Sequence, residues 1–228
     1  MSREGFFEPV CATAGGGMEN VMKRNPVITI ARQYGSRGSD IAKRLGEILG
    51  IKAYDKELIQ LAAERCGYHR DVLEKADEKA AGSLLYAIAT SAPSMFGGFG
   101  GHYDIPINDK LFIVQNNVIQ ELAASEQCII IGRCGDYALR NFEDKLCIFI
   151  YADIEDRVKY ISDIKGISES EAELLISKED KRRASYYNFY TGQKWGAPDR
   201  YAASINSSKF GIEGTAQIIA DMVKRVSE

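Results

Sequence analysis

The sequence has few residues that bind metals or form disulfides. It contains two histidines, five scattered cysteines and no C-x-x-C pair. A zinc site is therefore not expected, and an odd set of separated cysteines is typical of a reducing compartment. No apolar run approaches the roughly 20 residues that span a bilayer, and no secretory signal opens the chain. We therefore expect a cytoplasmic protein without a membrane partner.

The chain also lacks an excess of positive charge. Its net charge is −3 over 228 residues, of which 45% are hydrophobic. This balance gives no general attraction to nucleic acid, so no nucleic-acid partner is expected and any basic site must be local. The length suits one α/β domain whose core needs neither metal nor disulfide.

Short apolar segments alternate with segments of helical periodicity. We expect strands at 27–31, 51–54, 128–132 and 146–151, and a weaker one at 201–206. The third and fourth runs are apolar at nearly every position, which is typical of parallel strands covered on both faces. The predicted fold is therefore an α/β three-layer sandwich in which helices flank a parallel sheet. Helices are expected at about 38–50, 55–66, 70–80, 110–126, 154–165, 168–188 and 213–226.

Two segments interrupt this alternation. Residues 1–25 show no sustained periodicity, so we expect a flexible N-terminal extension before a domain at 26–228. Met18 follows a glycine triplet and is an alternative start to Met1, which mass spectrometry of the native N-terminus would test. Residues 96–101 are rich in glycine without a preceding strand, so a flexible loop is favoured over a dinucleotide-binding turn. The role of that loop stays open.

A glycine-bearing loop joins the first expected strand to the first helix. Small residues let a backbone approach an oxyanion closely at a helix N-terminus. Arg32 and Arg37 add positive charge, whereas Asp40 suits either Mg²⁺ or the helix dipole. The alternative is a capped helix without a ligand, because Ser39 and Asp40 also suit an N-cap. The residues expected to hold the donor phosphates are Gly35, Ser36, Arg37, Gly38, Ser39 and Asp40.

The loop lacks one residue of the P-loop pattern G-x-x-x-x-G-K-[ST]. In that pattern the lysine reaches the β- and γ-phosphates of the nucleotide. An ungapped alignment places Gly38 at the lysine and Arg32 at the first glycine. We expect Arg37 to replace the lysine, and Ser39 or Asp40 to help hold Mg²⁺.

The segment 178–200 is locally basic in an otherwise acidic chain. It holds six Lys/Arg against three Asp/Glu and ends in an aromatic stretch with the single tryptophan. This composition suits a mobile cationic lid over transferring phosphates. A solvated basic helix is the alternative.

Several segments, taken in order, resemble the cytidylate kinase-like branch of the P-loop nucleoside monophosphate kinases. They are ITIARQYGSRGSDIAKRLGEILG, AYDKELI, IIIGRCGDY, FIYADIEDR, KEDKRRASYYNFYTGQKWG and INSSKFGIEGT, over roughly 27–225. The resemblance implies a five-stranded parallel sheet, an acceptor-binding insertion at about 55–110 and a lid at about 178–200. It also implies ATP with Mg²⁺ as the donor and a pyrimidine monophosphate as the acceptor.

The resemblance also implies roles for single residues at the acceptor. Arg133 follows a strand and matches, with Gly132, the Gly-Arg that contacts the acceptor nucleotide. Cys134 stands where an aspartate is expected, and Asp136 lies two residues further on. Asp55 lies where the acceptor-site helix begins, although a helix cap is the better interpretation of this residue taken by itself. A surface pair of Arg133 with Asp136 is the alternative for that segment.

In the lid, Asp180 and Arg183 match a D-x-x-R pair, and Arg182 or Lys181 is expected to close with Arg183 on the transferring group. Asn206 replaces the acidic residue of an I-D-[ST]-[ST] step.

The expected activity is transfer of the γ-phosphoryl group of ATP to a small acceptor, with a nucleoside monophosphate such as CMP as the first candidate. One alternative is a catalytically weak or inactive nucleotide- or phosphate-binding regulatory module, which the missing lysine favours. The other is a kinase for a different small metabolite, which the altered acceptor contacts favour. Association into a homo-oligomer is left open.

Overall fold

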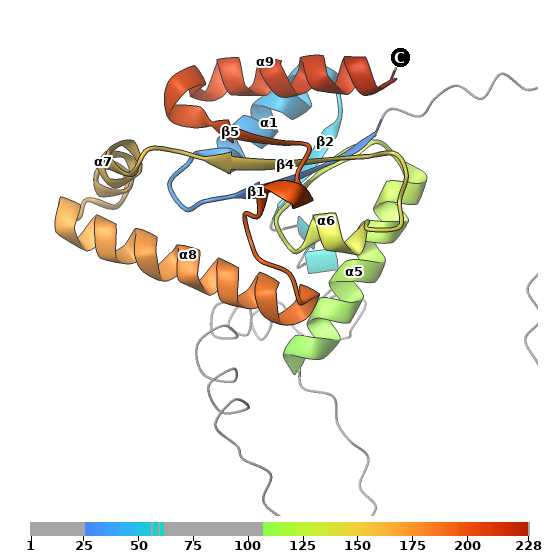
Figure 1. Ribbon diagram of the computed structural model, residues 1–228, viewed down its shortest axis with the longest axis horizontal. Helices are drawn as coiled ribbons and strands as arrows, with labels where there is room; N and C mark the ends of the chain where they lie inside the picture. The colour runs from blue at the N-terminus through green and yellow to red at the C-terminus, as the bar shows by residue number, and fades with distance from the viewer. Residues whose placement is uncertain (1–25, 56, 59, 62–106, 228) are drawn as a thin grey trace, which may run out of the picture.

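The computed structural model describes residues 26–55, 57–58, 60–61 and 107–227 (Figure 1). Several expectations lie outside these residues. They are the N-terminal extension with its alternative start, the helix at 70–80, most of the acceptor-binding insertion and the glycine-rich loop at 96–101.

Five parallel strands form the central sheet, in the order β2-β3-β1-β4-β5. Ile28 of the central strand pairs with Ile129 on one side and Leu146 on the other. Because β1 lies between β3 and β4, the loop after β1 opens where the strand order reverses, at the carboxyl edge where such sheets bind ligands. The bounds are β1 (Val27–Arg32), β2 (Lys52–Tyr54), β3 (Cys128–Ile131), β4 (Lys145–Tyr151) and β5 (Ala203–Asn206). The predicted five-stranded parallel sheet is confirmed.

Helices cover both faces of the sheet. In Figure 1, α1 and α9 lie on one face, and α5, α6 and α8 lie on the other. Their bounds, with one 3₁₀ turn, are α1 (Gly38–Leu49), α5 (Ile107–Ser125), α6 (Gly135–Ala138), α7 (Ile154–Lys165), α8 (Glu169–Thr191), η1 (Pro198–Arg200) and α9 (Ser207–Ser227). The sequence does not predict α6 and η1, because a single turn is too short for a periodic pattern. A kink at Gly211 (φ 64°, ψ −172°) likewise conceals the start of α9.

Alternate residues of the strands face opposite helical layers, as strand geometry requires. Ile28 and Ile30 pack in a core cluster with Leu45 of α1 and Ile219 of α9. Val27 and the buried residues of β3 that face the other way pack against α5. All four residues of β3 are buried, so the expected double coverage is confirmed. None of the helices in the described part of the chain is both long and apolar enough to cross a membrane.

Candidate functional site

The loop between β1 and α1 leaves the helix N-terminus open. Arg37 is the N-cap of α1 in a left-handed conformation (φ 60°), and no side chain caps the helix. Ser39 and Asp40 lie inside the first turn, so neither supplies the cap that the sequence allows. Gly35 is left-handed as well (φ 80°), and a Cβ there would lie 3.2 Å from the Cβ of Arg157. The first N–H groups of α1 therefore face the loop without a side-chain partner in the cap position, which suits an anion.

Hydrogen bonds to its own backbone and to β5 hold the loop. Ser36 is buried, and its hydroxyl donates to the backbone oxygen of Gln33 (2.9 Å). Ser207, directly after β5, has its hydroxyl 2.8 Å from the backbone oxygen of Ser36. The Ser36 side chain is therefore occupied within the fold, which leaves the backbone of the loop for the phosphate role that the sequence predicts.

A buried ion pair fixes the start of the loop to α7 and α8. Arg157 of α7 is 5% exposed, and its guanidinium pairs with the carboxylate of Asp180 of α8. Both side chains also bind the backbone of Tyr34. The Tyr34 N–H donates to the Asp180 carboxylate (2.7 Å), and Arg157 Nε donates to the Tyr34 backbone oxygen (2.8 Å). Both backbone groups of one loop residue are therefore held by one ion pair.

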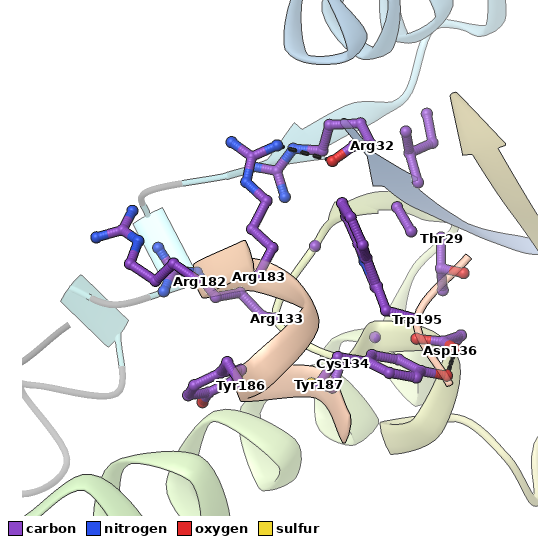
Figure 2. A pocket seen from close by; sticks show the side chains of 14 residues that line it. Thr29, Arg32, Arg133, Cys134, Asp136, Arg182, Arg183, Tyr186, Tyr187 and Trp195 are labelled. Atoms are coloured by element: carbon purple, nitrogen blue, oxygen red, sulfur yellow. Dashed lines mark hydrogen bonds between the residues drawn. The ribbon is translucent and has the colours of Figure 1, made fainter. Parts of the chain in front are cut away.

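A pocket of about 150 Å³ opens at the carboxyl ends of β1 and β3, under α8 (Figure 2). Four arginines line it, which is a local concentration of positive charge in an acidic chain. The lining residues are Thr29, Ile30, Ala31, Arg32, Gly132, Arg133, Cys134, Gly135, Asp136, Arg182, Arg183, Tyr186, Tyr187 and Trp195. We refer to it as the arginine pocket.

Arg32, the last residue of β1, extends its side chain into the arginine pocket. Its Nη2 donates to Asp55 at the end of β2 (3.3 Å), and its side chain is 16% exposed. Two glycines make room for it: a Cβ at position 38 would lie 2.6 Å from the Arg32 Cβ, and one at position 132 would lie 1.9 Å from its Nη1. Ser39 Oγ donates to the second oxygen of Asp55 (3.1 Å).

Arg183 reaches from α8 to the end of β1. Its Nη1 donates to the backbone oxygen of Arg32 (2.7 Å), and its guanidinium lies over the Tyr34 ring at 5.5 Å. Figure 2 shows Arg183 and Arg32 side by side, joined by this hydrogen bond. Burial lowers the pKa of Arg183. The D-x-x-R pair of the sequence is thus divided: Asp180 holds the loop, and Arg183 lines the arginine pocket.

The turn after β3 consists of three successive left-handed residues, Gly132, Arg133 and Cys134 (φ 70°, 54° and 52°). Such a conformation costs about 1–3 kcal/mol for each non-glycine residue and concentrates at functional sites. The turn places Arg133 at the pocket. Burial raises the pKa of the Cys134 thiol, which indicates a packing residue rather than a nucleophile.

The far wall of the arginine pocket is acidic and aromatic. Tyr187 is buried and donates to Asp136 (2.5 Å), as Figure 2 shows. Burial raises the pKa of Asp136, although the Tyr187 hydrogen bond opposes the shift. Asp136 is thus engaged with Tyr187 of α8 and is partly buried, in contrast to the exposed position that the alternative of a surface pair with Arg133 implies.

A second pocket, of about 300 Å³, lies on the other side of the loop. Arg37 opens onto it, with its side chain 49% exposed, 3.6 Å from Asp40 and over the ring of Tyr160 at 5.1 Å. Its lining is Gly35, Ser36, Arg37, Ala152, Asp156, Lys159, Tyr160, Asp163, Ser207, Ser208, Gly211 and Ile212. We refer to it as the loop pocket. The two arginines of the loop therefore face different pockets.

The predicted metal ligands also separate. Ser39 lies beside Asp55, which gives a hydroxyl and a carboxylate within 3.1 Å of each other. Asp40 instead approaches Arg37 and Tyr160. Oxygen ligands of this kind fit Mg²⁺, which takes one or two protein oxygens and completes its shell with phosphates and water. Ser39 with Asp55 fits that requirement better than Ser39 with Asp40.

The sequence missed two arginines that shape the site. For Arg32 the sequence predicts only positive charge beside the phosphate loop, and the signal of a more specific place is its alignment with the first glycine of the P-loop pattern. Arg157 was not singled out, and only its position in the segment FIYADIEDR pointed to it.

The sequence profile of the cytidylate kinase-like family matches residues 27–209. The chain belongs to this family. Among solved structures it is similar to an uncharacterized protein from Eubacterium ventriosum ATCC 27560, with 28% identity, a TM-score of 0.65, and coverage of 89% of this chain and 99% of that chain. No curated protein compared with the sequence matches it significantly.

Two more distant structures share the fold alone. Shikimate kinase from Bacteroides thetaiotaomicron is 14% identical, with a TM-score of 0.51 and coverage of 87% of this chain and 98% of that one. A gluconokinase from Sinorhizobium meliloti 1021 is 12% identical, with a TM-score of 0.50 and coverage of 90% and 95%. The chain therefore shares its fold, a five-stranded parallel sheet flanked by helices, with a shikimate kinase and a gluconokinase.

Proposed function

We propose that this cytidylate kinase-like protein transfers the γ-phosphoryl group of ATP to a small acceptor, with a nucleoside monophosphate such as CMP as the first candidate. The observation that carries the proposal is the arginine pocket. Four guanidinium groups from three separate parts of the chain line one pocket beside an open helix N-terminus. Phosphoryl transfer needs this arrangement, because its catalysis is mainly positioning and neutralisation of charge.

The loop pocket is the proposed donor side. The backbone at 35–39 binds the donor phosphates, since the N–H groups at the start of α1 face the loop. Arg37 and Lys159 supply positive charge there, and Tyr160 supplies an aromatic face. A ring and a guanidinium at 5.1 Å form a surface on which a nucleoside can rest.

The arginine pocket is the proposed acceptor side. Arg133 binds the acceptor phosphate, because a guanidinium offers two parallel donors to such a group. Asp136, with Tyr187, presents hydrogen-bonding groups to the rest of the acceptor. Arg182 and Arg183 neutralise the transferring group, while Asp180 acts through the loop that it holds.

Mg²⁺ supplies charge neutralisation between the donor phosphates when it is bound. Ser39 and Asp55 would hold it, because their oxygens lie together at the start of α1. Asp55 then serves both the metal and Arg32. A cytoplasmic location, a lid at about 178–200 and self-association remain predictions from the sequence.

The test is ADP release from ATP–Mg²⁺ with a panel of acceptors: CMP, other nucleoside monophosphates, shikimate and gluconate. The last two are included because kinases with this fold are named for them. We expect one acceptor to stimulate ADP release, and Arg133→Ala to raise its KM by about tenfold to a hundredfold, as loss of a charge-assisted contact of 1.5–3 kcal/mol implies. Lys224→Ala is the control, because the Lys224 side chain is 65% exposed and pairs with Asp221 on α9, which covers the other face of the sheet (Figure 1).

Binding of ATP without ADP release for any acceptor would reject the kinase and support the regulatory module. Stimulation by shikimate or gluconate but not by a nucleotide would reject CMP and keep the phosphotransferase.

A further inference from the structure

The position that the P-loop pattern gives to lysine cannot hold a side chain in this protein. A Cβ at Gly38 would lie 2.6 Å from the Cβ and 2.9 Å from the Cγ of Arg32. These atoms belong to the stem of the arginine, next to its own backbone, so they have little freedom to move away. The space that a lysine side chain would enter is therefore already filled by Arg32.

The Arg32 side chain continues from that space into the arginine pocket. It passes so closely over Gly132 that a Cβ there would lie 1.9 Å from its Nη1. Its other terminal nitrogen binds Asp55, which anchors the guanidinium between the phosphate loop and the turn that carries Arg133. The Arg32 guanidinium thus lies between the loop proposed to bind the donor and the turn that carries Arg133 into the arginine pocket.

We propose that Arg32 is the catalytic cation that replaces the P-loop lysine, delivered from the end of β1 instead of from the start of α1. The proposal rests on the proposed phosphotransfer and names a residue for it. Arg37 is the rival, but it opens onto the loop pocket and its side chain is 49% exposed, against 16% for Arg32. Arg37 therefore serves the donor nucleotide, and Arg32 serves the transferring group.

The step balances as an in-line displacement. The bond between the γ-phosphorus and the β,γ-bridging oxygen breaks, and its electron pair stays on ADP. A new bond forms between the γ-phosphorus and an oxygen of the acceptor; a phosphate dianion needs to lose no proton, whereas a hydroxyl acceptor releases one. Arg32 stabilises the negative charge on the transferring oxygens, as a cation at this place does in related transfers.

The test moves the cation between the two positions. We expect Arg32→Ala to lower kcat by about 10³-fold, the lower end for a missing transition-state cation. We expect Gly38→Lys alone to disrupt the protein, because the two side chains collide. In the double variant Arg32→Gly/Gly38→Lys both contacting atoms, the Cβ and the Cγ of residue 32, are removed, so kcat should rise at least about tenfold above that of Arg32→Gly alone. Arg32→Lys keeps the charge and serves as a second variant if the alanine variant does not fold.

Two comparisons separate this role from a structural one. Arg37→Ala should raise the KM for ATP more than it lowers kcat, and a fall in kcat equal to that of Arg32→Ala would overturn the proposal. Calorimetry with ATP, ADP and AMP gives a readout without turnover. The melting temperature first checks that Arg32→Ala is as stable as wild type. This variant should then bind ATP and ADP more weakly but AMP equally well, because the lysine that Arg32 replaces contacts the β- and γ-phosphates.

The outcomes distinguish the two proposals. If wild type binds ATP but releases no ADP with any acceptor, the phosphotransfer is rejected, and the calorimetric difference between ATP and AMP still decides whether Arg32 contacts the phosphates. Either of two results would overturn the role of Arg32. One is an equal loss of affinity for ATP, ADP and AMP. The other, if the wild type is active, is a folded double variant whose kcat does not recover.

Discussion

Removal of the Asp180 carboxylate should destabilise the protein through the phosphate loop. The Arg157 and Asp180 side chains are only 6% and 19% exposed, so Asp180→Ala leaves a buried guanidinium without its partner. Breaking such a pair from one side costs about 3–5 kcal/mol. The Tyr34 N–H loses its acceptor in the same variant, so we expect the upper half of this range.

Thermal unfolding followed by circular dichroism measures the effect. One kcal/mol shifts the melting temperature by about 2–4 °C in a domain of this size, so a loss of about 4–5 kcal/mol in Asp180→Ala should lower it by about 8–20 °C. Asp180→Asn keeps an oxygen for the Tyr34 N–H and removes only the charge. It should therefore fall between wild type and Asp180→Ala, and its affinity for ATP should exceed that of the alanine variant.

Lys209→Ala is the matched control, because it breaks an ion pair with Asp153 in which the side chains are 66% and 38% exposed. Exposed pairs are screened by solvent and contribute little to stability, so its melting temperature should shift much less than that of Asp180→Ala. A shift for Asp180→Ala no larger than that of Lys209→Ala would refute the reasoning that the loop depends on this buried pair.

Two further substitutions test packing and titration. Gly38→Ala forces a methyl group against the stem of Arg32 and should lower the free energy of unfolding by about 1–3 kcal/mol in urea titration, as overpacking does; an unchanged midpoint would contradict the close contact. Burial raises the pKa of the Asp136 carboxyl in the folded state. Ionising this carboxyl therefore destabilises the folded protein. This loss of stability is absent below the unfolded pKa of about 4 and complete above the folded pKa. Asp136→Asn should therefore be more stable than wild type at about pH 7 and lose this advantage as the pH falls to about 4. A difference in stability that stays constant across that pH range would show that the pKa of Asp136 is not raised.

The sequence predicts the sheet because its strands are short, strongly apolar runs. Each residue of β3 is buried whichever face it occupies, so a continuous apolar run is the signal of that position. The sequence also predicts the loop after β1, because small residues at a strand–helix junction let the backbone approach an anion at the helix N-terminus. Local pattern was sufficient for both features.

Direction and burial of charged side chains could not be predicted in the same way. Arg157 lies in a helix among Asp and Glu, a pattern typical of solvent-exposed positions, and only the packing of α7 against α8 buries it. Arg37 and Arg32 are both loop cations in the sequence, but the left-handed backbone at position 37 turns one towards the loop pocket. Arg32 ends β1, and the direction of that strand carries its side chain into the arginine pocket.

The departures from the P-loop pattern are coupled. A lysine at position 38 is accommodated without strain only where position 32 is glycine, because its Cβ would meet the Cβ of any other residue there. An arginine at position 32 in turn favours glycine at positions 38 and 132, so Arg32, Gly38 and Gly132 are sterically coupled. The absent lysine and the unexpected arginine are then two consequences of a single exchange, which keeps a cation between donor and acceptor while changing the element that delivers it.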